Sequence, residues 1–245
     1  YAQKGYNLVF GHGYEYNEPA SEVAKDFPDV VFVSSSGGST AKNVGAFRFS
    51  LEQGFYLAGM MGAMMSKTGK IGSVSLGGIP SIDSTLTAYE AGAKAANPKI
   101  ELKRVRIQTD GDVASAKQAT EQLADAGFDF VIHQANSSAQ GVFDAAKEKK
   151  IWAFGANLNQ NDNASGSVIA SAIIIAKPAF LALAKEVQAK TFQGRVVTAG
   201  MKDGAIDFVT NPKLDAQIPA NVKKTIDEAA KAIKAGTLNV PMAKF

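Results

Sequence analysis

The polar residues that could do chemistry gather in loops that follow short apolar runs. The run that ends at Ile132 leads into "HQANSSAQ", residues 133–140, which holds a histidine, three amide side chains and two serines. Four further loops of this kind are "GHGYEYNE" (11–18), "LGGIPSID" (76–83), "GANLNQNDN" (155–163) and "GMKDGAID" (200–207). Ligands of open parallel sheets bind outside the carboxyl ends of the strands. The five loops are therefore the expected place of a binding site.

These loops offer amides, hydroxyls and aromatic rings. An amide presents a donor and an acceptor on one group, which suits a nucleobase edge or a sugar hydroxyl, and an aromatic ring can stack on a base. Phe143 follows "HQANSSAQ" in the first turn of a helix, where it either faces a cleft or packs the helix on the sheet. Of Tyr14 and Tyr16, at most one is expected to meet a ligand. Lys202 either donates to a ligand hydroxyl or pairs with Asp203.

Signatures of catalysis are missing from the sequence. There are no cysteines, and the only histidines are His12 and His133. The chain lacks the H-E-x-x-H, G-x-S-x-G, P-loop and G-x-G-x-x-G patterns. We therefore expect no enzyme, no bound metal and no cofactor. The open alternative is a nucleoside hydrolase or phosphorylase, for which the candidate acid–base groups besides the histidines are Asp83, Asp110 and Asp162, none paired at a useful spacing.

Composition indicates a globular protein. Of 245 residues, 46% are hydrophobic and 20% are charged, which fits one large or two modest domains. The net charge is only +3, and the lysines are spread along the chain, so no nucleic-acid partner is expected. The longest apolar stretch, "GFYLAGMMGAMM" (54–65), is too short to cross a bilayer and predicts a buried helix. The opening "YAQKGYNLVF" resembles the end of a helix followed by a strand, so further residues are expected upstream.

A repeated unit predicts the fold class. A short apolar run, a polar loop and an amphipathic helix follow one another from "YNLVF", from "IGSVSL" and from "FDFVI". Continuous apolar strands that alternate with helices are typical of parallel sheets covered on both faces. The sequence therefore predicts an α/β protein with doubly wound parallel sheets.

Two stretches break this alternation. Residues 43–59 and 165–180 pass from an extended piece directly into a helix, as segments do when they cross between lobes. We expect one lobe formed by residues 50–169 and a second formed by residues 1–49 together with 170–245.

Several motifs in order resemble one family over nearly all of residues 5–241. They are "LEQGFYLAGMMGAMMSKTGKIGSV", "GGIP", "AYEAGAKAANP", "GVFDAAKEKK" and "GMKDGAIDF". Together they are similar to the basic membrane protein family of substrate-binding proteins, which contains the purine nucleoside receptor lipoproteins. The resemblance implies a periplasmic-binding-protein-like type I fold, two lobes joined by three crossings. It also implies a monomer, periplasmic or lipid-anchored at the outer face of the cytoplasmic membrane, that passes a purine nucleoside or nucleobase to an ABC permease.

The resemblance also implies roles for individual residues. Phe143 matches a base-stacking aromatic, and Lys202 matches a lysine that reaches the ribose. Gly78 matches a loop whose backbone meets the ligand, and Glu18 falls near an acidic position. The expected ligand contacts in full are Phe143, Asn136, Ser137, Asn157, Lys202, Gly78, Tyr14 and Glu18.

Position 157 bears on the choice of ligand. Many nucleoside-binding relatives carry Asp where this chain has Asn157, and "HQANSS" is closer to the purine-base binders. The sequence therefore predicts recognition of the purine more strongly than recognition of a ribose. A second alternative to the transport role is the effector-binding region of a transcription regulator, which shares the fold.

Overall fold

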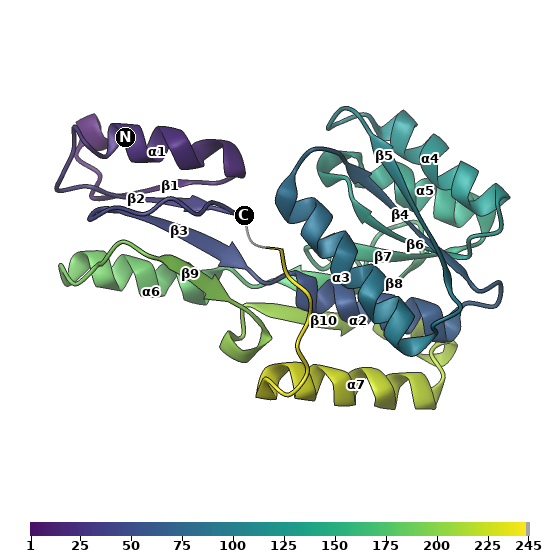
Figure 1. Cartoon of the computed structure of the whole chain (residues 1–245). Helices are drawn as coiled ribbons and strands as arrows, with labels where there is room; N and C mark the ends of the chain where they lie inside the picture. Colours follow the sequence, from purple (N-terminus) through teal and green to yellow (C-terminus); the bar gives the residue numbers. More distant parts are fainter. Residues whose placement is uncertain (244–245) are drawn as a thin grey trace. The chain divides into compact units, whose positions relative to one another are not determined.

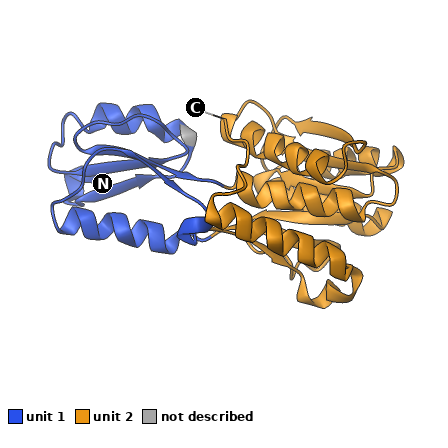
Figure 2. Ribbon diagram, turned by 60° about the horizontal axis from the view of Figure 1, so that its bottom comes forward, with its two compact units in different colours: residues 1–50, 175–205, 245 blue, residues 51–174, 206–244 orange. Residues whose placement is uncertain are grey.

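The computed structural model of the chain describes residues 1–243, except for the side chain of Tyr14. The chain forms two compact units, drawn in two colours in Figure 2. Unit 1 comprises Tyr1–Ser50 and Ile175–Ala205, and unit 2 comprises Leu51–Ile174 and the described residues from Ile206 on. The chain thus passes between the units three times, which confirms the expected number of crossings.

Unit 1 is built on a four-stranded parallel sheet in the order β1-β2-β3-β9. Its strands are β1 (Leu8–Gly11), β2 (Val31–Ser35), β3 (Val44–Phe49) and β9 (Val196–Ala199). Its helices are α1 (Asn17–Val23) and α6 (Lys177–Gln188), with short 3-10 turns η1 (Ala2–Lys4), η2 (Tyr14–Tyr16) and η4 (Met201–Asp203). Apolar side chains of the strands and of α6 form one core cluster, centred on Val33, Phe47 and Leu183.

Unit 2 is built on a six-stranded sheet in the order β10-β8-β7-β6-β4-β5 (Figure 1). Its strands are β4 (Lys70–Leu76), β5 (Glu101–Ile107), β6 (Phe130–Gln134), β7 (Trp152–Asn157), β8 (Val168–Ile174) and β10 (Ile206–Thr210). Its helices are α2 (Glu52–Met65), α3 (Pro80–Ala96), α4 (Val113–Asp125), α5 (Ala139–Lys149) and α7 (Ala220–Ala235), with 3-10 segments η3 (Asn136–Ser138) and η5 (Pro212–Gln217). All strand pairs are parallel except β10 with β8.

Helices cover both faces of this sheet. Helix α2 packs on α3 and on α7, and α4 packs on α5. The strands are buried between these layers: every residue of β6, for example, is buried. The doubly wound parallel architecture predicted from the apolar strands is therefore confirmed. The apolar stretch 54–65 lies in α2 and is mostly buried, as expected. Among the described helices, none is both long and apolar enough to span a membrane.

One boundary differs from the expectation. The sequence assigned residues 170–245 to the same lobe as residues 1–49, whereas the structure places the described residues from Ile206 on in unit 2. The reason is strand pairing, because β10 extends the six-stranded sheet antiparallel to β8. Helix α7 then packs on α2 of the same unit. Strand β8 itself also belongs to unit 2, so the second crossing follows Ile174.

Candidate functional site

Three of the polar loops meet at one edge of the unit 2 sheet. Strands β7, β6 and β4 are neighbours and run parallel, so their carboxyl ends lie together. Asn157 is the last residue of β7, η3 begins two residues after β6, and Gly78 follows β4. Five of the eight predicted contact residues, Gly78, Asn136, Ser137, Phe143 and Asn157, therefore belong to this unit. We call this region the carboxyl edge of unit 2.

The loop after β6 is held by an aspartate from the loop that follows β5. The Ser137 hydroxyl and its backbone N–H both donate to the Asp110 carboxylate, at 2.6 and 3.1 Å. These bonds, the hydroxyl first, hold the pKa of Asp110 below its usual value. Asn136 has a positive φ of 45°, a conformation that asparagine tolerates better than most residues. Asn136 and Ser137 are both exposed, so their remaining polar atoms can meet a ligand.

A buried amide links the ends of β6 and β7. Gln134 is only 5% exposed. Its side-chain nitrogen donates to the Thr85 hydroxyl of α3 at 3.3 Å, and its oxygen accepts from the Asn157 side chain at 3.4 Å. Asn157 has a φ of 67° and is half-buried. Asn136, just after β6, and Asn157, at the end of β7, thus both have a backbone conformation in the left-handed region.

His133 lies one residue earlier on β6 and is buried, at 1% exposure. Its Nε2 is 2.8 Å from the side-chain oxygen of Gln160, which also accepts the backbone N–H of Ala156. Since that oxygen can only accept, the ring donates from Nε2. Burial lowers the pKa of His133 to about 4, against the opposing effect of the bond to Gln160. His133 is therefore neutral at pH 7 and joins β6 to the loop after β7.

Phe143 packs against this histidine. The two rings are edge-on, with centroids 5.2 Å apart and planes at 87°. The Phe143 side chain is 1% exposed, so its ring offers no free face in this structure. This is the packing role that the sequence left open as the alternative, and contact with a ligand stays a prediction for this residue.

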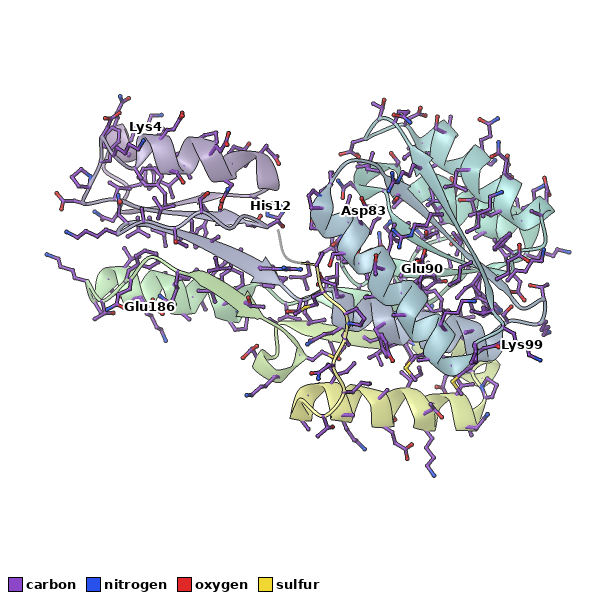
Figure 3. The ribbon with its side chains drawn as sticks, viewed as in Figure 1. Lys4, His12, Asp83, Glu90, Lys99 and Glu186 are labelled. Atoms are coloured by element: carbon purple, nitrogen blue, oxygen red, sulfur yellow. The ribbon has the colours of Figure 1, made fainter. Side chains whose placement is uncertain are left out.

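Gly78 occupies a backbone conformation that favours glycine. Its φ is 77°, and open space surrounds the place where a Cβ would stand. The loop leads into α3, where Figure 3 shows Asp83 and Glu90. Arg106 donates to Asp83 at 2.9 Å, and Arg104 donates to Glu90 at 2.8 Å, so arginines of β5 engage both carboxylates.

The remaining predicted contacts belong to unit 1. Lys202 is exposed in η4, and Asp203 beside it accepts the backbone N–H of Gly200 at 2.9 Å. Glu18 is exposed in the first turn of α1. Tyr14 lies in η2, and its side chain is outside the described part of the structure.

The acid–base candidates do not converge. His12 of unit 1 bonds the Ser35 hydroxyl at 3.1 Å, and His133, Asp83 and Asp110 are engaged as described above. Lys213 donates to Asp162 at 2.7 Å. Across residues 1–243, no group of three His, Asp or Glu side chains is arranged to hold a metal ion. The carboxyl edge of unit 2 is thus equipped to form hydrogen bonds.

Sequence reasoning missed the buried partners of the site. Thr85, Gln134 and Gln160 determine where Asn157 and His133 point, yet none was singled out. The available signal was weak: Gln134 and His133 are two polar residues at the end of a strand that begins with apolar residues. Thr85 lies in a stretch of mixed polar and apolar helix residues, so nothing in the sequence distinguishes it from the other polar residues there.

Two parallel-dominated α/β units joined by three passages define a periplasmic-binding-protein type I fold. An ABC transporter solute-binding protein of Aeropyrum pernix matches all of this chain and 80% of its own length with a TM-score of 0.86 at 19% identity. A transcriptional activator of the comK gene from Bacillus halodurans matches 96% of this chain and 81% of its own length with a TM-score of 0.84 at 23% identity. At these identities the likeness shows the fold alone.

The profile of the Bmp family, described as ABC transporter substrate-binding protein PnrA-like, matches residues 1–243. The chain belongs to this family. It is 28% identical to a purine-binding protein of Brucella abortus over 97% of this chain and 66% of that protein. It is 30% identical to basic membrane protein A2 of Borrelia garinii over 98% of this chain and 73% of that protein. The resemblance noted in the sequence is confirmed.

Proposed function

We propose that the protein is the substrate-binding component of an ABC importer and that it binds a purine nucleoside or a free purine base. The observation that carries this proposal is the chemistry of the carboxyl edge of unit 2. The exposed Asn136 and Ser137 and the half-buried Asn157 present amides and a hydroxyl that suit the donor and acceptor pattern of a purine edge. Membership of a substrate-binding family and the similarity to a purine-binding protein support it.

Roles follow for the individual contacts. Asn136 and Asn157 read donors and acceptors of the ligand, Ser137 adds a hydroxyl, and the backbone at Gly78 approaches closely because no side chain stands there. Phe143 packs against His133, just before the loop after β6, and stacks on the base if binding uncovers its ring. Lys202, Glu18 and Tyr14, which belong to unit 1, are the remaining proposed ligand contacts.

The cellular role follows from the same proposal. The protein acts outside the cytoplasmic membrane, in the periplasm or held by a lipid anchor, and delivers its ligand to a membrane permease. It works as a monomer without a cofactor and does not bind nucleic acid.

Binding is tested by titration calorimetry with adenosine, guanosine, inosine, adenine and hypoxanthine. We expect at least one of them to bind with a Kd below about 100 μM, which corresponds to about 5.5 kcal/mol. Glucose and ribose serve as controls for a sugar-binding site. Absence of binding by all five purine compounds would contradict the proposal.

The enzyme alternative is tested in the same samples. Incubation of the bound nucleoside with the protein, followed by chromatography, is expected to return the nucleoside intact. Release of free base at a rate above the protein-free control would instead assign a hydrolase or phosphorylase activity.

A regulatory role is the second candidate, because the chain is also 28% identical to a transcriptional activator of Bacillus subtilis over 91% of this chain and 70% of that protein. The two roles differ in where the protein acts. Fractionation of cells is expected to place the protein outside the cytoplasmic membrane. Recovery in the cytoplasm together with the nucleoid would favour the regulator.

A further inference from the structure

A directed chain of hydrogen bonds runs from α3 to the carboxyl edge of unit 2. The Thr85 hydroxyl donates to the backbone carbonyl of Ile82 at 2.8 Å. A carbonyl can only accept, and a hydroxyl has one proton to donate. The bond to Ile82 therefore leaves the Thr85 oxygen as an acceptor towards the rest of the site.

This first bond sets the direction of every later one. Because the Thr85 oxygen accepts, Gln134 must turn its amide nitrogen towards it, at 3.3 Å. The Gln134 oxygen then faces Asn157 and accepts from the Asn157 nitrogen at 3.4 Å. Gln134 is buried and 5% exposed, so water does not compete readily for either end of its amide. We call Ile82, Thr85, Gln134 and Asn157 the amide relay.

The amide relay ends at Asn157, which is half-buried. With its nitrogen engaged by Gln134, the half-buried Asn157 presents its side-chain oxygen, for which the described residues provide no hydrogen-bond donor. An asparagine without such a partner can turn either end of its amide towards a ligand, whereas the bond to Gln134 fixes which end of the Asn157 amide is the nitrogen.

We propose that Gln134 is a positioning residue that makes Asn157 a dedicated acceptor, so that the protein selects ligands with a hydroxyl or N–H donor at this point. The inference rests on the proposed binding of purines and adds to it the polarity of one contact. The carboxamide oxygen offers this acceptor without placing a charge in a half-buried position.

The variants are chosen to interrupt the relay at two points. Gln134→Met removes both ends of the buried amide at similar volume, while Thr85 keeps its bond to Ile82. Thr85→Val removes the hydroxyl that orients Gln134, and Thr85→Ser restores it. Ser75 provides the matched control: it pairs with Gln134 in the β4–β6 register and is fully buried, yet its hydroxyl has no partner among the described residues. Ser75→Ala therefore changes the same buried region without touching the relay.

The ligands are chosen to lack one donor each. The tightest binder among adenosine, inosine and guanosine is compared with its 2′-fluoro and 3′-fluoro analogues, and the tightest binder among adenine and hypoxanthine with its 7-methyl and 9-methyl derivatives. Affinities are measured by titration calorimetry for the wild type and the four variants, after thermal melts show which variants fold.

In the wild type, we expect at least one analogue to bind about tenfold or more weakly than its parent, or about 1.4 kcal/mol, because the Asn157 oxygen then faces no donor. In Gln134→Met and Thr85→Val, the ratio of the Kd of that analogue to the Kd of its parent falls to about threefold. The reason is that the Asn157 side chain, no longer held by Gln134, can present either end of its amide. Thr85→Ser and Ser75→Ala keep the wild-type ratio. If Gln134→Met does not fold, Thr85→Val alone decides.

The failures of the two proposals are distinguishable. A wild type that binds none of the parent compounds overturns the proposed function and the relay with it. A wild type that binds a parent and all its analogues equally overturns the relay alone. The relay alone is also overturned if Gln134→Met and Thr85→Val, where they fold, keep the wild-type ratio of affinities. It is likewise overturned if Ser75→Ala lowers that ratio as much as they do.

Discussion

Replacing Gly59 or Gly92 with alanine is expected to lower the free energy of unfolding by about 3 kcal/mol or more, even though alanine favours helices. The two glycines let α2 and α3 approach backbone to backbone. A Cβ on Gly59 would run into the carbonyl of Tyr89, with the carbonyl carbon 2.8 Å away. A Cβ on Gly92 would run into the carbonyl of Tyr56 in the same way, again with the carbon at 2.8 Å. Backbone atoms cannot turn aside as a side chain can, so the helices must separate.

Denaturant unfolding followed by circular dichroism measures this loss. Gly62→Ala in the same helix is the control, because a Cβ there would be 3.3 Å from the Phe154 ring, which can shift slightly. We expect this control to stay within about 1 kcal/mol of the wild type. If Gly59→Ala and Gly62→Ala unfold at the same denaturant concentration, the close approach of α2 and α3 does not exist in solution.

The second large effect is a loss of stability in acid caused by His133. Burial lowers the pKa of this residue to about 4 in the folded protein, while a solvated histidine in the unfolded chain has a pKa of 6.5. Above pH 6.5 the ring is neutral in both states, and its contribution to stability does not change. As the pH falls from 6.5 to 4, the unfolded state binds a proton at His133 that the folded state does not bind, so the folded state loses stability. Each pKa unit corresponds to about 1.4 kcal/mol, so the total loss is about 3 kcal/mol by pH 4.

His133→Gln isolates this contribution, since glutamine can donate to Gln160 but does not titrate. The free energy of unfolding is measured for both proteins from pH 7.5 to pH 4. Carboxylates contribute to both curves and cancel in the difference. We expect the wild type to lose about 3 kcal/mol more than the variant over this range. Parallel curves for the two proteins would show that His133 does not stay neutral in the folded state.

The bounds of helices could be predicted closely from the sequence where they depend on the spacing of neighbouring residues. The alanine and leucine spacing of residues 113–126 predicts a helix, and the structure has α4 from Val113 to Asp125. Gly236 predicts the end of a helix, and α7 ends at Ala235. Asp112 explains where α4 begins, because its side chain accepts the N–H of Ser115 at 2.9 Å.

The assignment of the C-terminal segment was wrong because it depends on a pairing that no local pattern records. Strand β10 has the composition of many strands, and its neighbour β8 lies more than thirty residues earlier in the chain. Only the register between Ile206 and Ile174 shows that β10 completes the sheet of unit 2. A strand's apolar pattern indicates that it needs a neighbour, and tertiary structure decides which neighbour it has.

The same division applies to the candidate site. The sequence by itself determined that parallel strands end in polar loops rich in amides and hydroxyls, because strand and helix periodicities and residue types are local properties. Only the tertiary structure decided that Phe143 is buried against His133 and that the side-chain nitrogen of Asn157 donates to Gln134. Thr85, Gln134 and Asn157 are distant in the sequence, and the direction of a hydrogen bond depends on which groups the fold brings within about 3 Å of one another.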